Sequence, residues 1–339
     1  MFIANHNLGA DGVYIIAELS ANHSGNIDIA KKTIKAAKEC GANAIKLQTY
    51  TPEWMTLKVD KEEFKANHLW QGRYLYDLYD EARLPLEWHE ELFLYAKKIG
   101  IDIFSTPFSK EAVDFLEKFN PPAYKIASFE ITDYALVRYV ARKQKPIIIS
   151  TGIATQEEIA DVVRICKEES NEEIVLLKCT SSYPTPLEDA NLATIVDMKK
   201  RFDVTVGFSD HTLGILAPVV AVSLGAQVIE KHFILDKSLP SADSKFSLDP
   251  KEFKQMVDTV RDSQKLIGNI SYTPKEGNRA YARSLYIVKD VKEGEVVTEE
   301  NIRSIRPGYG MHPKYLDKIL GKKFRNNYKK GTPLAWEHI

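Results

Sequence analysis

The chain has 339 residues, of which 44% are hydrophobic and 27% are charged, a balance that is typical of a folded globular protein and excludes global disorder. Its formal net charge of −1 excludes a broad basic surface for nucleic acid or for an anionic membrane. We therefore expect small-molecule partners, and any anion-binding site must be built from local charges.

Cysteine usage and the first residues indicate a cytoplasmic protein. The three cysteines lie far apart without metal-ligand spacing, and no basic stretch followed by an apolar run and a cleavage site is present near Met1. We therefore expect a reducing cytoplasm as the location. One long uncharged stretch, residues 212–229, contains Gly214, Pro218 and Gly225. It predicts a buried helix followed by a strand, because a membrane-spanning helix needs about 20 predominantly apolar residues.

Short runs rich in Val and Ile alternate with amphipathic segments along most of the chain. The runs predict strands at residues 13–19, 44–49, 102–108, 123–128, 146–152, 174–180, 204–211 and 228–233. Apolar residues three and four apart predict helices between them, such as residues 27–40, 87–99, 110–119, 156–167 and 250–267. This α/β alternation favours a closed parallel (β/α)8 TIM barrel. An open doubly wound sheet is the main alternative, but no glycine-rich dinucleotide loop follows the first strand.

The pattern changes after Ile267. The next residues are rich in Gly, Asn, Ser, Thr and Pro, a composition that is typical of a linker. Beyond them, short apolar pieces such as residues 284–288 are separated by turn sequences, which predicts a compact module of short strands. We therefore predict a barrel domain over residues 1–268, a linker over residues 269–280 and a small domain over residues 281–339.

Polar residues stand at or near the carboxyl ends of all eight predicted strands, where functional groups lie in barrels of this kind. For a single serine or threonine, capping of the next helix explains the position equally well. Eight strands with such residues together predict a site at the barrel mouth. The residues are Glu18, Lys46, Gln48, Thr106, Lys125, Ser128, Ser150, Ser181, Ser209, His211, Glu230 and His232.

Two lysines inside apolar strands indicate an anion site. Burial of Lys46 or Lys125 is costly unless an anion meets the ammonium group. Lys46 and Gln48 point to the same face of one strand, so both can enter the barrel mouth. With nearby hydroxyl groups the lysines could hold a phosphate and a carboxylate of one small substrate. Two alternatives stay open: either lysine reaches outward to solvent, or Lys46 pairs with Glu230.

His211 and His232 are candidates for a metal site, since they occupy neighbouring strands at similar depth. Two imidazoles can hold one divalent ion when water and substrate oxygens complete the shell. Such a mixed shell suits Mn²⁺ or Mg²⁺, whereas a structural zinc site needs four protein ligands. Two hydrogen-bonded core histidines are the alternative interpretation.

The chain resembles the sialic acid synthase family over essentially its whole length. The motifs that carry the resemblance lie at residues 17–23, 46–50, 105–108, 124–128, 150–152, 179–184, 207–211 and 230–233, with two more at 282–285 and 306–308. The resemblance implies a TIM barrel followed by a small antifreeze-like domain (SAF, β-clip). It also implies a metal-dependent enzyme that condenses phosphoenolpyruvate, as co-substrate, with an aldehyde sugar.

The family resemblance also implies roles for particular residues. Phosphoenolpyruvate would be held by Lys46, Thr106, Lys125, Ser128, Ser150, Ser181 and Ser209. The metal, Mn²⁺ or Mg²⁺, would be held by His211 and His232. The sugar or the reacting centre would face Glu18, Gln48, Glu130, Tyr183 and Asp243. The sialic acid branch of the family often has Asn where Ser181 stands, which shortens the reach to phosphate here. A domain-swapped homodimer is implied, in which the small domain of one subunit delivers Arg306 to the other's barrel mouth.

The segments around the expected sugar site resemble the branch that acts on a 6-deoxy sugar with acetamido groups at C2 and C4. Trp70 and Phe246 are candidates for apolar walls. Legionaminic, N-acetylneuraminic and spore-coat branches would share the catalytic motifs. An enzyme making shorter phosphorylated keto acids is a more distant alternative. A non-enzymatic carbohydrate-binding protein is an alternative of another class, but a neutral sugar would give the two lysines no anion.

Overall fold

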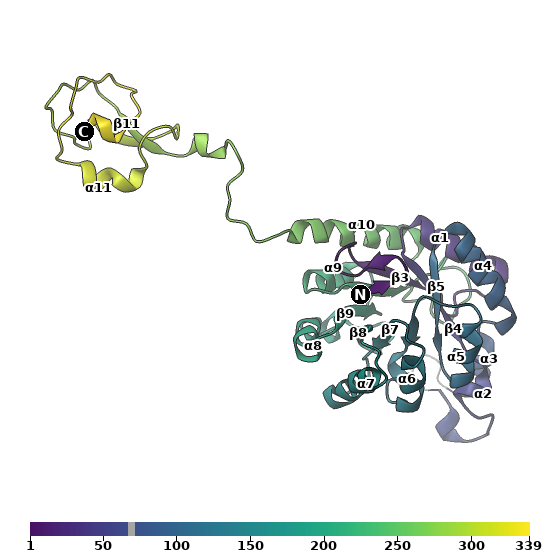
Figure 1. The fold of residues 1–339 in the computed structure, drawn as a ribbon. Coiled ribbons are helices and arrows are strands. Elements are labelled where there is room, and N and C mark those ends of the chain that lie inside the picture. Colours follow the sequence, from purple (N-terminus) through teal and green to yellow (C-terminus); the bar gives the residue numbers. More distant parts are fainter. Residues whose placement is uncertain (67–71) are drawn as a thin grey trace. The chain divides into compact units, whose positions relative to one another are not determined.

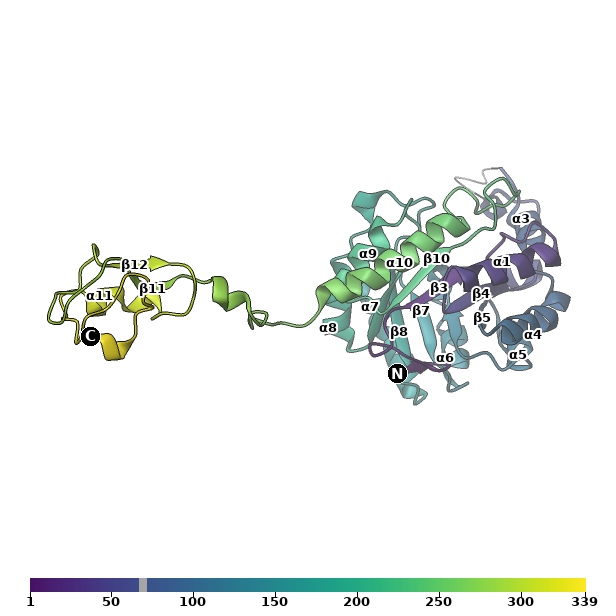
Figure 2. The same ribbon diagram turned by 90° about the horizontal axis from the view of Figure 1, so that it is seen from above.

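The computed structural model describes residues 1–66 and 72–339. The chain divides into two compact units, Met1–Gly268 and Asn269–Ile339. The first unit contains the strands and helices of the predicted barrel, and the second contains a short antiparallel sheet (Figures 1 and 2). Each unit has its own hydrophobic core.

The first unit is a closed barrel of eight parallel strands, which confirms the predicted fold and excludes the open sheet. The barrel closes because β10 pairs with β3 in parallel register, with His232 opposite Glu18. The strands in chain order are β3 (Tyr14–Glu18), β4 (Ala44–Thr49), β5 (Asp102–Pro107), β6 (Tyr124–Ile126), β7 (Ile147–Ser150), β8 (Ile174–Cys179), β9 (Thr205–Asp210) and β10 (Val228–His232). The predicted fourth strand was too long, since a 3₁₀ turn begins at Ser128.

Helices surround the barrel (Figure 2). Two helices begin with capping boxes, in which side chains satisfy the first backbone N–H groups: Thr155 with Glu158 in α7, and Asp249 with Glu252 in α10. Among the described residues, no helix is both long and apolar enough to cross a membrane. The helices are α1 (Ile27–Glu39), α2 (Pro52–Met55), α3 (Leu75–Ala82), α4 (His89–Ile99), α5 (Lys110–Glu117), α6 (Tyr134–Ala141), α7 (Gln156–Glu168), α8 (Thr194–Phe202), α9 (Leu216–Ser223) and α10 (Pro250–Ile267).

The period of two along each strand places apolar side chains deep in the barrel and polar side chains at its carboxyl end. Residues two apart on one face change from apolar to polar, for example from Ile16 to Glu18 and from Ala44 to Lys46. At the amino-terminal end, the hairpin of β1 (Phe2–Ile3) and β2 (His6–Asn7) packs Ile3 against this interior cluster. The barrel is therefore filled at one end and carries functional groups at the other.

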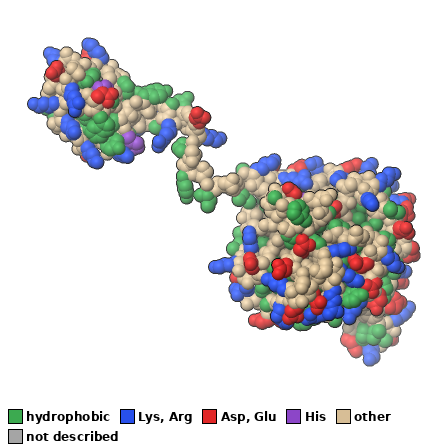
Figure 3. All heavy atoms as spheres, viewed as in Figure 1, with side chains coloured by type: hydrophobic (Ala, Val, Ile, Leu, Met, Phe, Trp, Pro, Cys, Tyr) green, Lys and Arg blue, Asp and Glu red, His purple; other side chains and the backbone are tan. Residues whose placement is uncertain are grey.

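Charged side chains of both signs are interspersed over the face of the first unit that Figure 3 shows. This mixture agrees with the formal net charge of −1. A surface without a field of one sign gives no long-range attraction for a polyanion. The face shown therefore offers no broad basic region for a polyanion.

The second unit is a small domain around a two-stranded antiparallel sheet. Strand β11 (Ser284–Ile287) pairs with β12 (Ile302–Ile305), and the short helix α11 (Leu316–Ile319) follows. Its core includes Leu285, Ile302 and Phe324, all at most 1% exposed. Residues 269–277, within the predicted linker, form neither helix nor strand.

Candidate active site

Two lysines and two glutamates meet inside the barrel mouth, and each is at most 5% exposed. Lys46 Nζ lies 2.6 Å from Glu18 Oε2 and 3.6 Å from Glu230 Oε1. Lys125 Nζ lies 3.8 Å from the same Glu230 oxygen. Both lysines therefore face inward, and the alternative that they reach outward to solvent is wrong. Lys46 does approach Glu230, as the other alternative held, but Glu18 is its nearer partner.

Hydroxyl groups line this cluster and leave donors available. Lys125 donates to Ser150 Oγ over 2.7 Å, and Lys46 donates to Thr106 Oγ1 over 3.2 Å. A hydroxyl group that accepts from an ammonium group keeps its own hydrogen for another acceptor. Ser209 donates to Glu230 Oε1 over 3.4 Å. The arrangement can therefore offer several N–H and O–H donors to one small anion.

A second set of donors lies beside Gly152. Its backbone N–H donates to Ser128 Oγ over 3.0 Å, and Ser181 Oγ is buried without a hydrogen-bond partner. A β-carbon added at Gly152 would stand 2.3 Å from Ser181 Oγ and 2.8 Å from Ser128 Oγ. Glycine is therefore required here for two hydroxyl groups to converge. An unpaired buried hydroxyl group costs stability unless a ligand satisfies it.

Burial shifts the titration of the carboxyl groups in the mouth. Burial raises the pKa of Glu18 to about 7, although the nearby Lys46 ammonium lowers it in part. Burial also raises the pKa of Glu130 to about 7, and its Oε2 has no hydrogen-bond partner. Burial lowers the pKa of Lys125, with Glu230 opposing that shift. Carboxyl groups that titrate near neutral pH can take up and release a proton during a reaction.

His211 and His232 lie side by side at the end of β9 and β10, with ring centroids 5.4 Å apart. His211 Nδ1 lies 3.1 Å from the Thr180 carbonyl oxygen. Because a carbonyl only accepts, Nδ1 must carry the hydrogen, which leaves the Nε2 lone pair free. His232 Nδ1 is buried without a hydrogen-bond partner, 3.6 Å from Asp243 Oδ2. This donor pair fits a divalent ion.

The protein supplies few further metal ligands. In the part of the chain that the structure describes, no group of three or more His, Cys, Asp and Glu side chains could hold a metal ion. If the two imidazoles hold an ion, water and substrate oxygens would have to complete its shell. Manganese or magnesium fits this donor set better than a structural zinc ion does.

The residues expected near the sugar lie beside the lysines and the imidazoles. Gln48 Nε2 donates to Glu18 Oε1 over 3.2 Å and to Ser20 Oγ over 3.0 Å. The Tyr183 ring lies 4.3 Å from the His211 ring, centroid to centroid, and Asp243 is buried. Phe246, predicted as an apolar wall, lies 4.8 Å from the His232 ring. The other predicted wall, Trp70, lies outside the described residues.

Sequence reasoning did not assign a site role to two residues of the mouth. Glu230 lies between the two lysines; it was placed at the predicted mouth and considered as a partner of Lys46, but it was given no role toward substrate or metal. Its position two residues before His232 was a signal that it faces the same interior. Cys179 Sγ lies 3.7 Å from His211 Nδ1, and its place at the end of β8 gave a similar signal. Arg306 is exposed and follows β12 in the second unit.

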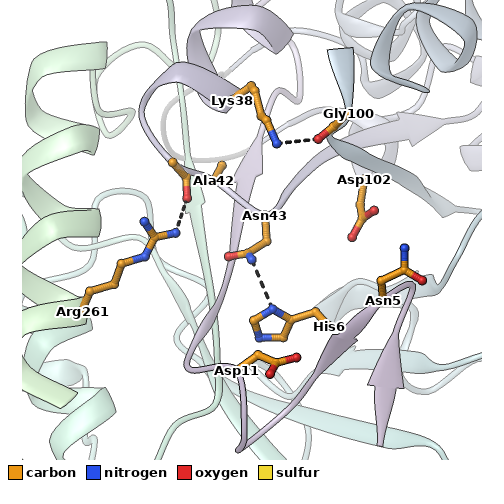
Figure 4. Close-up of a pocket in the computed structure, with 10 residues that line it drawn as sticks. Asn5, His6, Asp11, Lys38, Ala42, Asn43, Gly100, Asp102 and Arg261 are labelled. Carbon is orange, nitrogen blue, oxygen red and sulfur yellow. Dashed lines mark hydrogen bonds between the residues drawn. The ribbon is translucent and has the colours of Figure 1, made fainter. Parts of the chain in front are cut away.

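A hollow of ≈ 390 Å³ lies at the opposite end of the barrel, among turns that precede β4 and β5 (Figure 4). Several of its polar side chains have partners within the protein. Arg261 donates to the Gly41 carbonyl oxygen over 2.7 Å, and Asn43 Nδ2 lies 3.4 Å from His6 Nδ1. Groups at the amino-terminal face of a TIM barrel serve stability, whereas chemistry occurs at the carboxyl face. The site described above therefore remains the candidate active site.

A closed parallel barrel with a buried anion cradle and a histidine pair at its carboxyl end defines a TIM-barrel enzyme. The model of the NeuB family matches residues 33–272, and that of the SAF domain matches residues 282–339. The chain belongs to the NeuB family of sialic acid synthases, which confirms the resemblance. The small second unit is accordingly an SAF domain.

Individual relatives cover nearly the whole chain. A pseudaminic acid synthase of Campylobacter jejuni is 54% identical over 98% of both chains. A pseudaminic acid synthase of Helicobacter pylori is 48% identical over 96% of this chain and 97% of that relative. The crystal structure of an N-acetylneuraminic acid synthetase from Leptospira borgpetersenii superimposes with a TM-score of 0.74 at 31% identity, covering 82% of this chain and 93% of that one.

Proposed function

We propose that the protein is a pseudaminic acid synthase, a transferase. It condenses phosphoenolpyruvate with 2,4-diacetamido-2,4,6-trideoxy-L-altropyranose and water, and it releases pseudaminic acid and phosphate. The observation that carries the reaction type is the pair of buried lysines with their hydroxyl partners beside two imidazoles. The sugar is supported by the relatives: two pseudaminic acid synthases share about half of their residues with this chain, whereas the N-acetylneuraminic acid synthetase shares 31%.

Phosphoenolpyruvate fits the donors of the barrel mouth. Lys46 and Lys125 offer two ammonium groups, and the surrounding hydroxyl groups offer directed hydrogen bonds to phosphate and carboxylate oxygens. The hydroxyl donors are those of Thr106, Ser128, Ser150, Ser181 and Ser209. These groups are already oriented by the protein, so they require little rearrangement as charge moves during the reaction.

His211 and His232 would hold Mn²⁺ or Mg²⁺, with Asp243 near the second imidazole. When bound, the ion supplies a Lewis acid that polarises the aldehyde oxygen of the open-chain sugar. Gln48, Glu130 and Tyr183 would orient the sugar beside the lysines. Phe246, which packs against the His232 ring, supplies apolar surface next to them.

The reaction forms one carbon–carbon bond and, from water, one carbon–oxygen bond, and it breaks the carbon–oxygen bond to phosphate. C3 of phosphoenolpyruvate attacks the aldehyde carbon, the aldehyde oxygen takes up a proton to become a hydroxyl group, and C2 becomes electron-deficient. Water adds to C2, and the resulting tetrahedral carbon expels phosphate. Glu18, with a pKa of about 7, would accept the proton of the attacking water. Lys46 and Lys125 stabilise the charge on the departing phosphate through their ammonium groups.

A homodimer would complete the site. Large apolar side chains are exposed in the segments that follow β6, β7, β8 and β9, up to the first residue of α9, an arrangement that is typical of a covered surface. They are Phe129, Ile153, Leu187, Leu213 and Leu216. The SAF domain of one subunit would cover this rim of its partner and bring Arg306 to the phosphoenolpyruvate carboxylate or phosphate. The three free, buried cysteines support a cytoplasmic location.

Subunit mixing tests the swap directly. R306A and H211A are each expected to be inactive as homodimers. After mixing and re-equilibration, half of the dimers are mixed, and a swapped mixed dimer holds one intact site of two. About a quarter of wild-type activity should therefore return. If Arg306 served its own barrel, the mixed dimer would contain no intact site, and activity would not return.

The proposed reaction is tested by incubating the protein with phosphoenolpyruvate, Mn²⁺ and a panel of aldehyde sugars while phosphate release and product mass are followed. We expect release with the diacetamido 6-deoxy sugar, and loss of that release on chelation and in H211A. Faster release with a legionaminic, N-acetylneuraminic or spore-coat precursor would reassign the sugar. Phosphate release with none of the sugars would support the carbohydrate-binding alternative instead.

A further inference from the structure

A second buried ion pair lies directly behind the histidines. Lys231 Nζ is 2.5 Å from Asp210 Oδ2, and both side chains are fully shielded from solvent. Because successive strand residues face opposite sides, Lys231 points away from the interior that His232 faces. The pair therefore lies in the layer between the strands and the helices. It takes no part in binding substrate, so the proposed reaction leaves it without a role.

The pair ties together the two chain segments that carry the imidazoles. Asp210 immediately precedes His211, Lys231 immediately precedes His232, and the two charged residues are register partners of β9 and β10. Lys231 also donates to the Thr212 carbonyl oxygen. Asp210 Oδ1 accepts from the Thr212 backbone N–H over 2.8 Å. Three polar contacts thus fix the backbone on both sides of His211 to the residue before His232.

Stability alone does not account for such a pair. Removing two charges from water costs several kcal/mol per ion, and apolar pairs of similar volume are often equally stable or more stable. An ion pair differs from an apolar pair in its directional contacts, which specify a single arrangement. Here the contacts of Asp210 and Lys231 involve the residues next to His211 and His232. They therefore help to fix the relative position of the two imidazole rings.

We propose that Asp210 and Lys231 are positioning residues that hold His211 and His232 at the separation and orientation required to share one divalent ion. The inference rests on the metal site of the proposed function and deepens it. Outer groups that orient metal ligands contribute about 10- to 100-fold to metal affinity. The pair acts through the backbone, since neither side chain faces the barrel interior.

The test compares two double variants of the full-length protein. D210N/K231M removes both charges together, so no single buried charge is left unpaired, and it keeps an acceptor for the Thr212 N–H. E117Q/K145M removes a partly exposed ion pair whose lysine lies just before β7, at the amino-terminal end of the barrel. Mn²⁺ binding is measured by the electron paramagnetic resonance signal of free Mn²⁺, and folding is measured by thermal unfolding.

We expect D210N/K231M to unfold as cooperatively as the wild type and to bind Mn²⁺ at least about 10-fold more weakly. E117Q/K145M should keep the wild-type Kd within about twofold. A wild-type Kd in D210N/K231M overturns the inference while leaving the metal site intact. A wild type that binds no Mn²⁺ overturns the metal site and the inference with it. If D210N/K231M fails to fold, K231R, which keeps the charge but alters the geometry, must weaken Mn²⁺ binding for the inference to stand.

Discussion

Replacement of Lys125 by methionine gives the sharpest test of the anion cradle, the set of buried lysines and hydroxyl groups proposed to bind phosphoenolpyruvate. Lys125 is 1% exposed, and its Nζ contacts Ser150 Oγ at 2.7 Å and approaches Glu230 Oε1 at 3.8 Å. K125M removes one ammonium group and its hydrogen bond to the bound anion while roughly preserving side-chain volume. A hydrogen bond to a charged group contributes about 1.5–3 kcal/mol. The expected loss in kcat/KM for phosphoenolpyruvate is therefore about 10- to 150-fold.

The assay follows phosphate release at saturating sugar and Mn²⁺ while phosphoenolpyruvate is varied. K145M is the matched control, because Lys145 also pairs with a glutamate, Glu117 at 3.0 Å, but lies at the other end of the barrel. K145M should keep kcat/KM within about twofold of wild type. The reasoning is refuted if folded K125M, with a wild-type unfolding profile, loses less than about threefold in kcat/KM.

Three further predictions concern the same mouth. Since a protonated Glu18 repels the anion less, KM for phosphoenolpyruvate should rise as pH increases through about 7. A pH titration of KM in E18Q should show a smaller rise, because Glu130 also titrates at about 7, and a rise as large as in the wild type would contradict the role of Glu18. The kcat of E18Q should also fall more than about tenfold. S181A removes a buried hydroxyl group without a protein partner, so calorimetry should show an unchanged or slightly higher Tm while KM for phosphoenolpyruvate increases about threefold to tenfold; an unchanged KM would contradict a role of Ser181 in anion binding. G152A places a β-carbon against the two serine hydroxyls, and steady-state kinetics should show a loss in kcat/KM on the order of 100-fold; near-normal kinetics would contradict the close approach.

The barrel and the position of its mouth could be predicted because they depend on local periodicity. Helix α10 was predicted with the bounds that the structure shows, because its apolar residues recur three and four apart up to Ile267; in the structure Asp249 caps its first turn. Closure of the sheet then brings all strand ends together. Lys46 and Lys125 could for that reason be expected in one site although they are far apart in the sequence.

Pairwise contacts in the mouth could not be predicted, because they depend on distances across the barrel. The alternation of inward and outward side chains along β10 shows that Glu230 faces the barrel interior. It does not reveal that Glu230 lies between both lysines, or that Glu18 is the nearer partner of Lys46. The pairing of Lys231 with Asp210 depends on the register between β9 and β10. Charged residues beside two histidines look like surface residues until that register is known.

Glu18 and Glu230 neutralise the two buried lysines when no substrate is bound. An incoming phosphate or carboxylate must displace Glu18 and Glu230 from the lysine ammonium groups, so the net affinity is a difference between two anions. Inorganic phosphate, once formed, meets the same internal competitors. In the proposed reaction, the side chains that neutralise the lysines between turnovers would therefore also displace phosphate from them, which would limit inhibition by the product.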